Sequence, residues 1–237
     1  MRLNKYIAHA GICSRRKADE FIKAGLVKVN DEVVREMGYR VQEKDVIKFK
    51  DEVVRPVKDL VYVLLNKPKN FITTTSDERN RHTVMELVTH ATDKRIYPVG
   101  RLDRNTTGLL LLTNDGDLAQ RLSHPSGEVS KLYRVTLDVD LRQKDFDAIK
   151  KGLVLEDGLA LVDELSYIIG EEKSDIGIKI HIGRNRIVRR IFESLGYEVK
   201  KLDRVIYAGL TKKKLPRGKW RHLTQTEIIN LKHLKSN

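Results

Sequence analysis

The hydrophobic and polar positions at the start of the chain predict a small module of helices and strands. In "RLNKYIAHAG", Leu3 and Ile7 have helical spacing, and Ser14 is placed to cap a second helix, "RRKADEFIKAG". Alternation in "LVKVNDEVV", around an Asn-Asp turn, and in "DVIKF" predicts short strands. We expect a compact module over residues 1–56 and a polar linker over 57–61.

The remaining residues, 62–237, carry strand and helix patterns in no strict order. The segment "LVYVLLNKP" and the run Leu109–Leu112 are typical of buried strands. "KLYRVTLDVD" alternates so that Tyr133 and Val139 share one face, "LALVDELSYII" and "IGIKIHI" predict further strands, and "IVRRIFESLG" predicts a helix. The pattern predicts an α+β domain with a mixed, mostly antiparallel sheet.

Charge points to a polyanionic partner. Lys and Arg outnumber Asp and Glu by 46 to 33, which gives a formal net charge of +13. The excess is concentrated, because residues 1–58 hold 14 basic and 9 acidic side chains, whereas residues 179–222 hold 14 basic and 3 acidic ones. Two basic regions suggest two nucleic-acid contact surfaces, and a basic surface without function is the alternative.

Other features narrow the class of protein. The single cysteine, Cys13, excludes an internal disulfide framework and suits a reducing compartment. No apolar run approaches the ~18 residues of a membrane span, and the first residues carry charges where a signal peptide is apolar. The seven histidines show no ligand spacing, so we expect no metal site. We expect a soluble, cytoplasmic, monomeric protein with no membrane partner.

Cations cluster at the start of the second predicted helix, at Arg15, Arg16 and Lys17. The helix dipole disfavours each of them there by a few tenths of a kcal/mol, so local stability does not explain them. A helix N-terminus with three cations suits phosphate, and solvated surface charge is the alternative.

The stretch "RLNKYIAHAGICSRRKADEFIKAGLVKVNDEVV" resembles an S4 RNA-binding domain over its whole length. The shared features are the leading Arg-Leu, the Ser-Arg-Arg and the Gly-x-Val-x-Val-Asn turn. The resemblance implies RNA binding by this module, with the following candidate residues: Arg2, Lys5, Arg15, Arg16 and Lys17.

A candidate for chemistry lies in "GRLDRNTTGLLLLTNDGD", where Asp103 stands between Arg101 and Arg104. It falls on the connection that enters the predicted strand of leucines, and a loop residue held by a rigid strand suits catalysis. An ordinary capping or salt-bridge aspartate is the alternative, and periodicity does not exclude it.

The same segment resembles the signature of RsuA/RluB-type ribosomal RNA pseudouridine synthases, whose Gly-Arg-Leu-Asp aspartate is catalytic. "KLYRVTL" and "IGRNRIVRRIFESLGYEVKKLDR" fit this family in the expected order. The resemblance implies that Asp103 is catalytic, that Tyr133 stacks on the target base and that Arg189 pairs with the aspartate. From the residues alone, Tyr133 is a core aromatic, and Arg186, Arg189 and Arg190 all lie off the core face of their helix.

The implied reaction turns uridine into pseudouridine by breaking the C1′–N1 bond and joining C1′ to C5. There is no net redox change, so no cofactor is expected. An ionised aspartate acts on the sugar, either as a nucleophile at C1′ or as a base for the 2′ proton, and an adjacent arginine stabilises the carboxylate. The Tyr133 hydroxyl is a candidate for assisting loss of the C5 proton.

The target uridine must leave its stack to be reached, which requires a basic surface around the site. The cations between Lys179 and Arg221 are candidates for that surface. The individual RNA-binding candidates in this region are Arg101, Arg104, Arg184, Asn185, Arg186 and Arg190. For Arg101 and Arg104, bracing of the Asp103 loop is the alternative to contact with backbone phosphate. At the third motif Ile182 and Ile187 replace the family's acid and amide, which affects local RNA or loop contacts.

The expected partner is ribosomal RNA. "SHPSGEVSKLY" is more similar to enzymes of large-subunit (23S) rRNA, and small-subunit (16S) rRNA is the alternative. A non-catalytic S4-type rRNA-binding protein leaves the match of Asp103, Tyr133 and Arg189 unexplained. A glycosidase needs two opposed carboxylates, and no second one is marked out.

Overall fold

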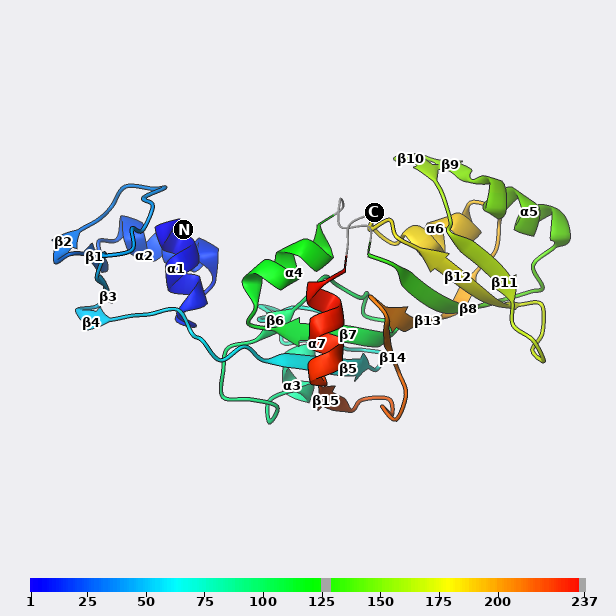
Figure 1. Cartoon of the computed structure of the whole chain (residues 1–237). Coiled ribbons are helices and arrows are strands. Elements are labelled where there is room, and N and C mark those ends of the chain that lie inside the picture. The colour runs from blue at the N-terminus through cyan, green and yellow to red at the C-terminus, as the bar shows by residue number, and fades with distance from the viewer. Residues whose placement is uncertain (125–128, 235–237) are drawn as a thin grey trace. The chain divides into compact units, whose positions relative to one another are not determined.

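The computed structural model describes residues 1–124 and 129–234, which form two compact units (Figure 1). The first unit comprises residues 1–61 with the short segments 92–96 and 114–116, and the second comprises the rest. The predicted boundaries at residues 56 and 62 did not assign these two short segments to the first unit, and the boundaries stay predictions.

The first unit packs two helices on a four-stranded sheet of order β2-β1-β3-β4. As predicted, the Ser14 hydroxyl caps α2, accepting from the backbone N–H of Lys17 at 3.2 Å, and the Asn-Asp turn joins β1 to β2. Leu3, Ile7 and Ile22 are buried in its core. The elements are α1 (Leu3–His9), α2 (Arg15–Lys23), β1 (Val27–Val29), β2 (Glu32–Val33), β3 (Ile47–Phe49) and β4 (Glu52–Val53).

The second unit is built on a nine-stranded sheet with the central order β11-β12-β8-β13-β7-β5-β15. Among the described strands, β13 and β7 pair in parallel and the other neighbours are antiparallel, which confirms the predicted α+β class. The strands are β5 (Tyr62–Lys67), β6 (Tyr97–Pro98), β7 (Thr107–Thr113), β8 (Lys131–Leu137), β11 (Glu164–Tyr167), β12 (Asp175–Ile180), β13 (Val199–Tyr207), β14 (Leu210–Thr211) and β15 (Trp220–His222). A separate hairpin consists of β9 (Leu153–Leu155) and β10 (Gly158–Ala160).

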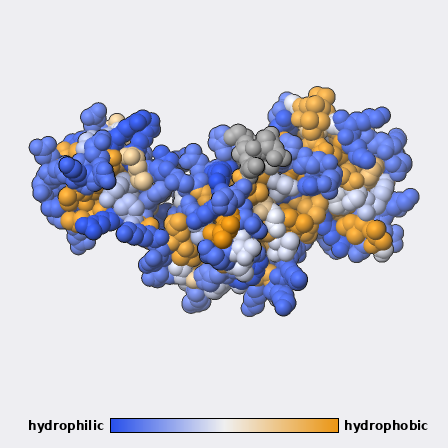
Figure 2. Space-filling view, in the orientation of Figure 1, coloured by the Kyte–Doolittle hydropathy of each residue, from blue (hydrophilic) through white to orange (hydrophobic). Residues whose placement is uncertain are grey.

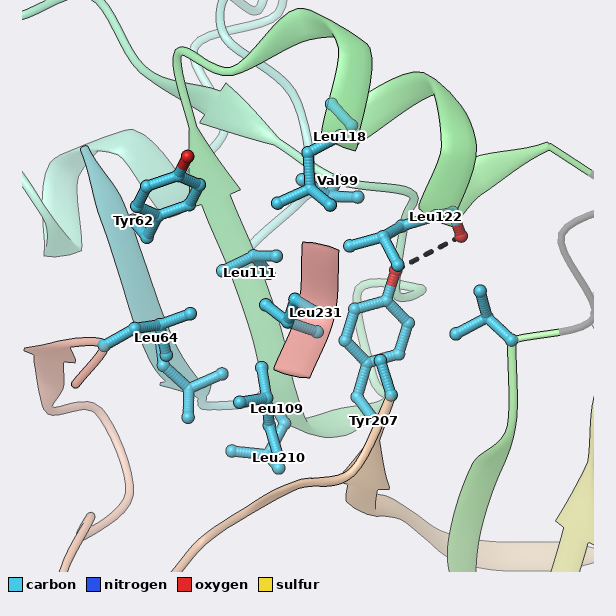
Figure 3. Close-up of a cluster of buried hydrophobic side chains, with 14 of the residues drawn as sticks. Tyr62, Leu64, Val99, Leu109, Leu111, Leu118, Leu122, Tyr207, Leu210 and Leu231 are labelled. Carbon is cyan, nitrogen blue, oxygen red and sulfur yellow. Dashed lines mark hydrogen bonds between the residues drawn. The ribbon is translucent and has the colours of Figure 1, made fainter. Parts of the chain in front are cut away.

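Helices cover parts of this sheet, and Figure 1 shows α4 and α7 beside β5 and β7. In Figure 3, Leu109 and Leu111 of β7 belong to one buried cluster with Leu118 and Leu122 of α4 and Leu231 of α7, and Leu109 lies beside Leu210. The leucine run is therefore the buried strand that the sequence predicts. The helices of this unit are α3 (Val84–Leu87), α4 (Gly116–Ser123), α5 (Gln143–Lys151), α6 (Ile187–Glu193) and α7 (Gln225–Lys232).

Two predicted strands are shorter than expected. Val139 is 57% exposed rather than inward, because β8 ends at Leu137 and the Asp138 carboxylate accepts from the backbone of Glu198 at 2.8 Å. "LALVDELSYII" is not one strand, since β10 and β11 divide it.

Gly108 allows β7 and β13 to approach closely beside the candidate site. It has a φ of +111°, and a Cβ on it would lie 2.3 Å from the carbonyl oxygen of Arg204, its partner in the parallel pair. No side chain fits there without moving the backbone of the neighbouring strand.

We therefore expect Gly108→Ala to lower the melting temperature of the second unit by on the order of 10 °C, through steric overlap and an unfavourable φ. Calorimetry on the purified chain measures this shift. Gly183→Ala is the matched control, because a Cβ there meets nothing within 4 Å and needs no positive φ. Equal shifts for the two variants would contradict the close-approach explanation.

Candidate active site

A buried lysine that the sequence analysis missed holds the loop that carries Asp103. Lys67, at the end of β5, is fully buried. Its Nζ donates to four backbone carbonyls, those of Pro68 (3.1 Å), Asp103 (3.0 Å), Arg104 (3.3 Å) and Thr106 (2.8 Å). Burial lowers the pKa of Lys67 to about 8, and the Asp103 charge opposes that shift. The loop is thus wrapped around one ammonium group.

Two further contacts fix the loop. The Thr73 hydroxyl donates to the carbonyl of Leu102 at 2.7 Å and accepts from its N–H at 3.2 Å. The backbone N–H of Asn70 donates to the carbonyl of Arg104 at 2.9 Å. The backbone on each side of Asp103 is therefore anchored to the segment that follows β5.

Asp103 lines a pocket of about 90 Å³, and its side chain is 42% exposed. Tyr133, on β8, lines the same pocket and is 8% exposed. The volume is below the roughly 300 Å³ at which drug-sized ligand pockets begin, so the pocket suits a single base. Its other lining residues are Arg101, Leu102, Thr106, Arg184, Arg186, Ile187, Val188 and Leu202. Asp103 is the one carboxylate among these described residues.

The ion pair that the structure gives Asp103 is with Arg186, whose Nη1 lies 3.8 Å from Oδ2. This distance allows charge stabilisation but is too long for a hydrogen bond. Arg186 precedes α6 with a left-handed φ of 47°, an uncommon conformation for a non-glycine residue, and it also pairs with Glu193 at 3.3 Å. The backbone turn thus directs this arginine between two carboxylates.

Arg189 differs from what was expected of it. It does not lie off the core face, because it is 9% exposed and its Nη1 donates to the carbonyl of Val199, the first residue of β13, at 2.8 Å. Its Nε has no partner among the described residues. Burial and then the Arg186 charge lower the pKa of Arg189, whereas the Asp103 charge raises it. A direct pair of Arg189 with Asp103 stays a prediction.

Arg184 and Arg190 bind the β9–β10 hairpin. Arg190 makes a bidentate pair with Asp157 at 2.5 and 2.8 Å, and Arg184 donates to the carbonyls of Gly158 and Leu159 at 3.0 Å. The arginines hold a hairpin whose strands expose apolar side chains, with Val154 84% and Leu159 49% exposed, and Figure 2 shows an apolar patch over this part of the surface. Their predicted RNA contacts are untested, and their structural partners are these backbone and carboxylate groups.

A wider open pocket, of about 510 Å³, lies on another side of Asp103. Arg101, Arg104 and Asn185 line it, as do Arg79 and Arg81, which the sequence analysis missed. Their segment, "DERNRH", has no periodicity that could indicate a site. The lining also holds three carboxylates, Asp77, Glu78 and Asp103, so its four arginines exceed them by one, and Arg81 is already paired with Asp77 at 2.5 Å.

The five candidates of the first unit lie on or beside its helices. Arg15 and Arg16 are exposed at the start of α2, and Lys17 pairs with Glu20 at 2.6 Å. Arg2 precedes α1, and Lys5 lies within it. Residues 1–124 and 129–234 hold no group of three or more His, Cys, Asp or Glu side chains that could bind a metal.

Comparison with known proteins identifies the family. A family model for RNA pseudouridylate synthases matches residues 61–194, more than half of the chain. The chain belongs to the RNA pseudouridine synthase family. A model for the S4 domain matches residues 1–47, so this family member carries an S4 domain at its start.

Relatives match this pseudouridine synthase over nearly its whole length. Ribosomal large subunit pseudouridine synthase B of Bacillus subtilis is 43% identical, covering 98% of this chain and 96% of the relative. The dual-specificity RNA pseudouridine synthase RluF of Escherichia coli is 36% identical, with coverage of 100% and 80%. A crystal structure of a pseudouridylate synthase superimposes with a TM-score of 0.69 at 30% identity, covering 98% of this chain and 99% of that one.

No helix of the described residues is long and apolar enough to cross a membrane.

We expect Lys67→Met to lower the kcat of pseudouridine formation by about 10- to 100-fold with little change in RNA Kd, because four carbonyls lose their donor and the Asp103 loop shifts. Single-turnover kinetics and binding titrations separate the two quantities. Lys69→Met is the control, since Lys69 is exposed two residues away. A change in Kd alone would contradict the positioning role.

Proposed function

We propose that this enzyme converts a uridine of 23S ribosomal RNA to pseudouridine, with Asp103 as its catalytic residue. The observation that carries the proposal is the pocket in which Asp103 meets Tyr133 and Arg186, three residues from separate segments of the chain. The large-subunit specificity in the name of the Bacillus subtilis relative supports the choice of rRNA.

In the proposed reaction Asp103 acts on the ribose while Tyr133 stacks on the uracil. The carboxylate either attacks C1′ or removes the 2′ proton, and in both routes the C1′–N1 bond breaks. The uracil then turns and C5 bonds to C1′, which breaks the Asp103–C1′ ester in the first route and is accompanied by return of the proton from Asp103 to C2′ in the second. C5 then loses its proton and N1 gains one. A single carboxylate in the pocket suits this chemistry and not that of a glycosidase, which needs a second one.

We propose that two arginines keep Asp103 ionised. Arg186 lies 3.8 Å from the carboxylate, and Arg189 contributes the positive charge of a buried guanidinium. When RNA covers the site and removes water from Asp103, both cations offset the cost of keeping a carboxylate charged.

The proposed RNA surface has two parts. In the second unit, Arg101, Arg104, Asn185 and Arg186 contact the strand around the target, and Arg184 and Arg190 contribute by holding the hairpin. In the S4 domain the proposed contacts are Arg2, Lys5, Arg15, Arg16 and Lys17. Because one chain carries both parts, we propose that it acts as a monomer, in the cytoplasm.

A 16S target is the second candidate, and the name of the Escherichia coli relative records dual specificity without naming its RNAs. The "SHPSGEVSKLY" segment that favours 23S rRNA includes residues 125–128, which lie outside the described residues. A binding-only role is less well supported, because it gives Asp103 and Tyr133 no reason to share a pocket.

Deleting the gene should remove at least one pseudouridine from 23S rRNA, and the wild-type gene should restore it. The Asp103→Asn gene should not restore this pseudouridine, because the amide neither attacks C1′ nor accepts the 2′ proton. Pseudouridine mapping of both rRNAs measures the result. Loss of a 16S site would select the second candidate, and restoration by the Asn variant would refute the role of Asp103.

The double variant Arg15→Gln, Arg16→Gln should weaken rRNA binding, by about one to two fewer counterions in the salt dependence, and leave kcat at saturating RNA unchanged. Binding titrations over a range of salt concentrations measure this slope. Lys23→Gln, at the other end of α2, is the control for charge alone. An unchanged slope in the double variant would exclude the proposed contact.

A further inference from the structure

A second pocket, of about 160 Å³, adjoins the pocket of Asp103. The two pockets have lining residues in common, namely Arg101, Tyr133, Arg184 and Ile187. The second pocket extends toward Leu122 and Tyr207, which Figure 3 shows side by side, with the tyrosine hydroxyl donating to the carbonyl of Leu122 at 3.4 Å. Tyr133 thus lines two adjoining pockets, one that contains Asp103 and a second that is partly apolar.

Arg204 lines the second pocket and is 3% exposed. On β13 it stands opposite Tyr133, its Nε donates to the carbonyl of Leu109 at 2.8 Å, and its guanidinium carbon lies 4.4 Å from the centre of the Tyr207 ring. Its Nη2 is buried and has no hydrogen-bond partner among the described residues. A buried charged donor without a partner is unfavourable, so a ligand that accepts a hydrogen bond from it is favoured.

Lys131 adds a second cation to this pocket, on the same face of β8 as Tyr133. Its Nζ donates to the carbonyl of His181 at 2.6 Å. Burial and the charge of Arg204 lower the pKa of Lys131 to about 8, and Asp163, whose charge opposes the shift, is bonded to the His181 ring at 2.6 Å. No ion pair to a carboxylate is formed by Lys131 or Arg204 within the described chain.

The proposed reaction generates an anion that needs such a site. When the C1′–N1 bond breaks, its electron pair stays on N1, so the uracil leaves with a negative charge shared by O2 and O4. After it turns, C5 bonds to C1′ and loses its proton, and N1 gains one. The nucleophile route and the 2′-proton route give the same uracil anion.

We propose that Lys131 and Arg204 bind this detached uracil anion through its carbonyl oxygens while it turns on the ring of Tyr133. This assignment rests on the proposed function. Fixed donors in a site with little water stabilise an anion far more than the neutral base of intact uridine, so they lower the barrier to bond breaking rather than only tightening RNA binding. The apolar lining of Leu122 and Ile187 suits the planar faces of a base better than a phosphate.

The test compares uridine with 5-fluorouridine at the target position of the rRNA fragment identified by mapping. Fluorine withdraws electrons and stabilises the detached anion by itself, so the enzyme's cations matter less. Under single-turnover conditions, Lys131→Met and Arg204→Gln should slow bond breaking by about 100-fold with uridine and by about tenfold or less with 5-fluorouridine. Lys131→Arg, which keeps the charge, should retain most of the rate, and Lys144→Met on α5 is the control for an exposed lysine.

Equal slowing of both RNAs would overturn the proposal, because a merely structural role affects both alike. A weaker RNA Kd with an unchanged single-turnover rate would also overturn it, and would indicate a backbone phosphate as the ligand. If Arg204→Gln does not fold, the comparison of Lys131→Met with Lys131→Arg tests the proposal by itself. Failure of the proposed function is distinguishable, because the wild-type enzyme would then convert neither RNA.

Discussion

The candidate active site depends on the placement of one ammonium group in the interior of the second unit. Four carbonyl oxygens of the Asp103 loop and its surroundings converge on Lys67, and without a cation they would repel one another. Lys67 can serve as this hub because β5 is buried along its whole length and pairs with β7 over six residues. The sheet thus fixes the position of Lys67, and the hydrogen bonds of Lys67 fix the backbone of the Asp103 loop.

A second network, of hydrogen bonds and ion pairs, lies where β7 pairs with β13. Thr107, next to Gly108, donates to the Asp203 carboxylate at 2.7 Å, and Lys212 and Arg217 also bind this carboxylate. Burial alone would raise the pKa of Asp203, but these hydrogen bonds lower it, so the group stays charged within the sheet. The parallel contact of β7 with β13 is therefore fixed by a close backbone approach and by an ionic group beside it.

Much of the fold follows from local patterns, whereas contacts between distant segments do not. The leucines of β7, the alternation in β8 and the Ser14 cap could be predicted because each depends on neighbouring residues. Lys67 was missed because a lysine after an apolar strand is typical of a strand end. Arg189 was misplaced because α6 has only seven residues, too few for its periodicity to define a face, and β13 covers it.

The same difference between local patterns and contacts of distant segments applies to the candidate site. The family signatures gave Asp103 and Tyr133, and the structure brings both to one pocket. Which arginine approaches the carboxylate depended on the backbone of Arg186, whose left-handed φ no spacing rule predicts. The charges of the second pocket, Lys131 and Arg204, lie on strands whose sequence suggests only alternation.

The exposure of Asp103 has a consequence for when the chemistry begins. With 42% of its side chain exposed, the Asp103 carboxylate is accessible to water, and hydration weakens a carboxylate as a nucleophile and as a base. Under the proposed function, the RNA itself forms the missing wall of the site and expels this water. On the same proposal, a free nucleoside is too small to cover Asp103, so we expect the enzyme to act on uridine only where it is part of an RNA.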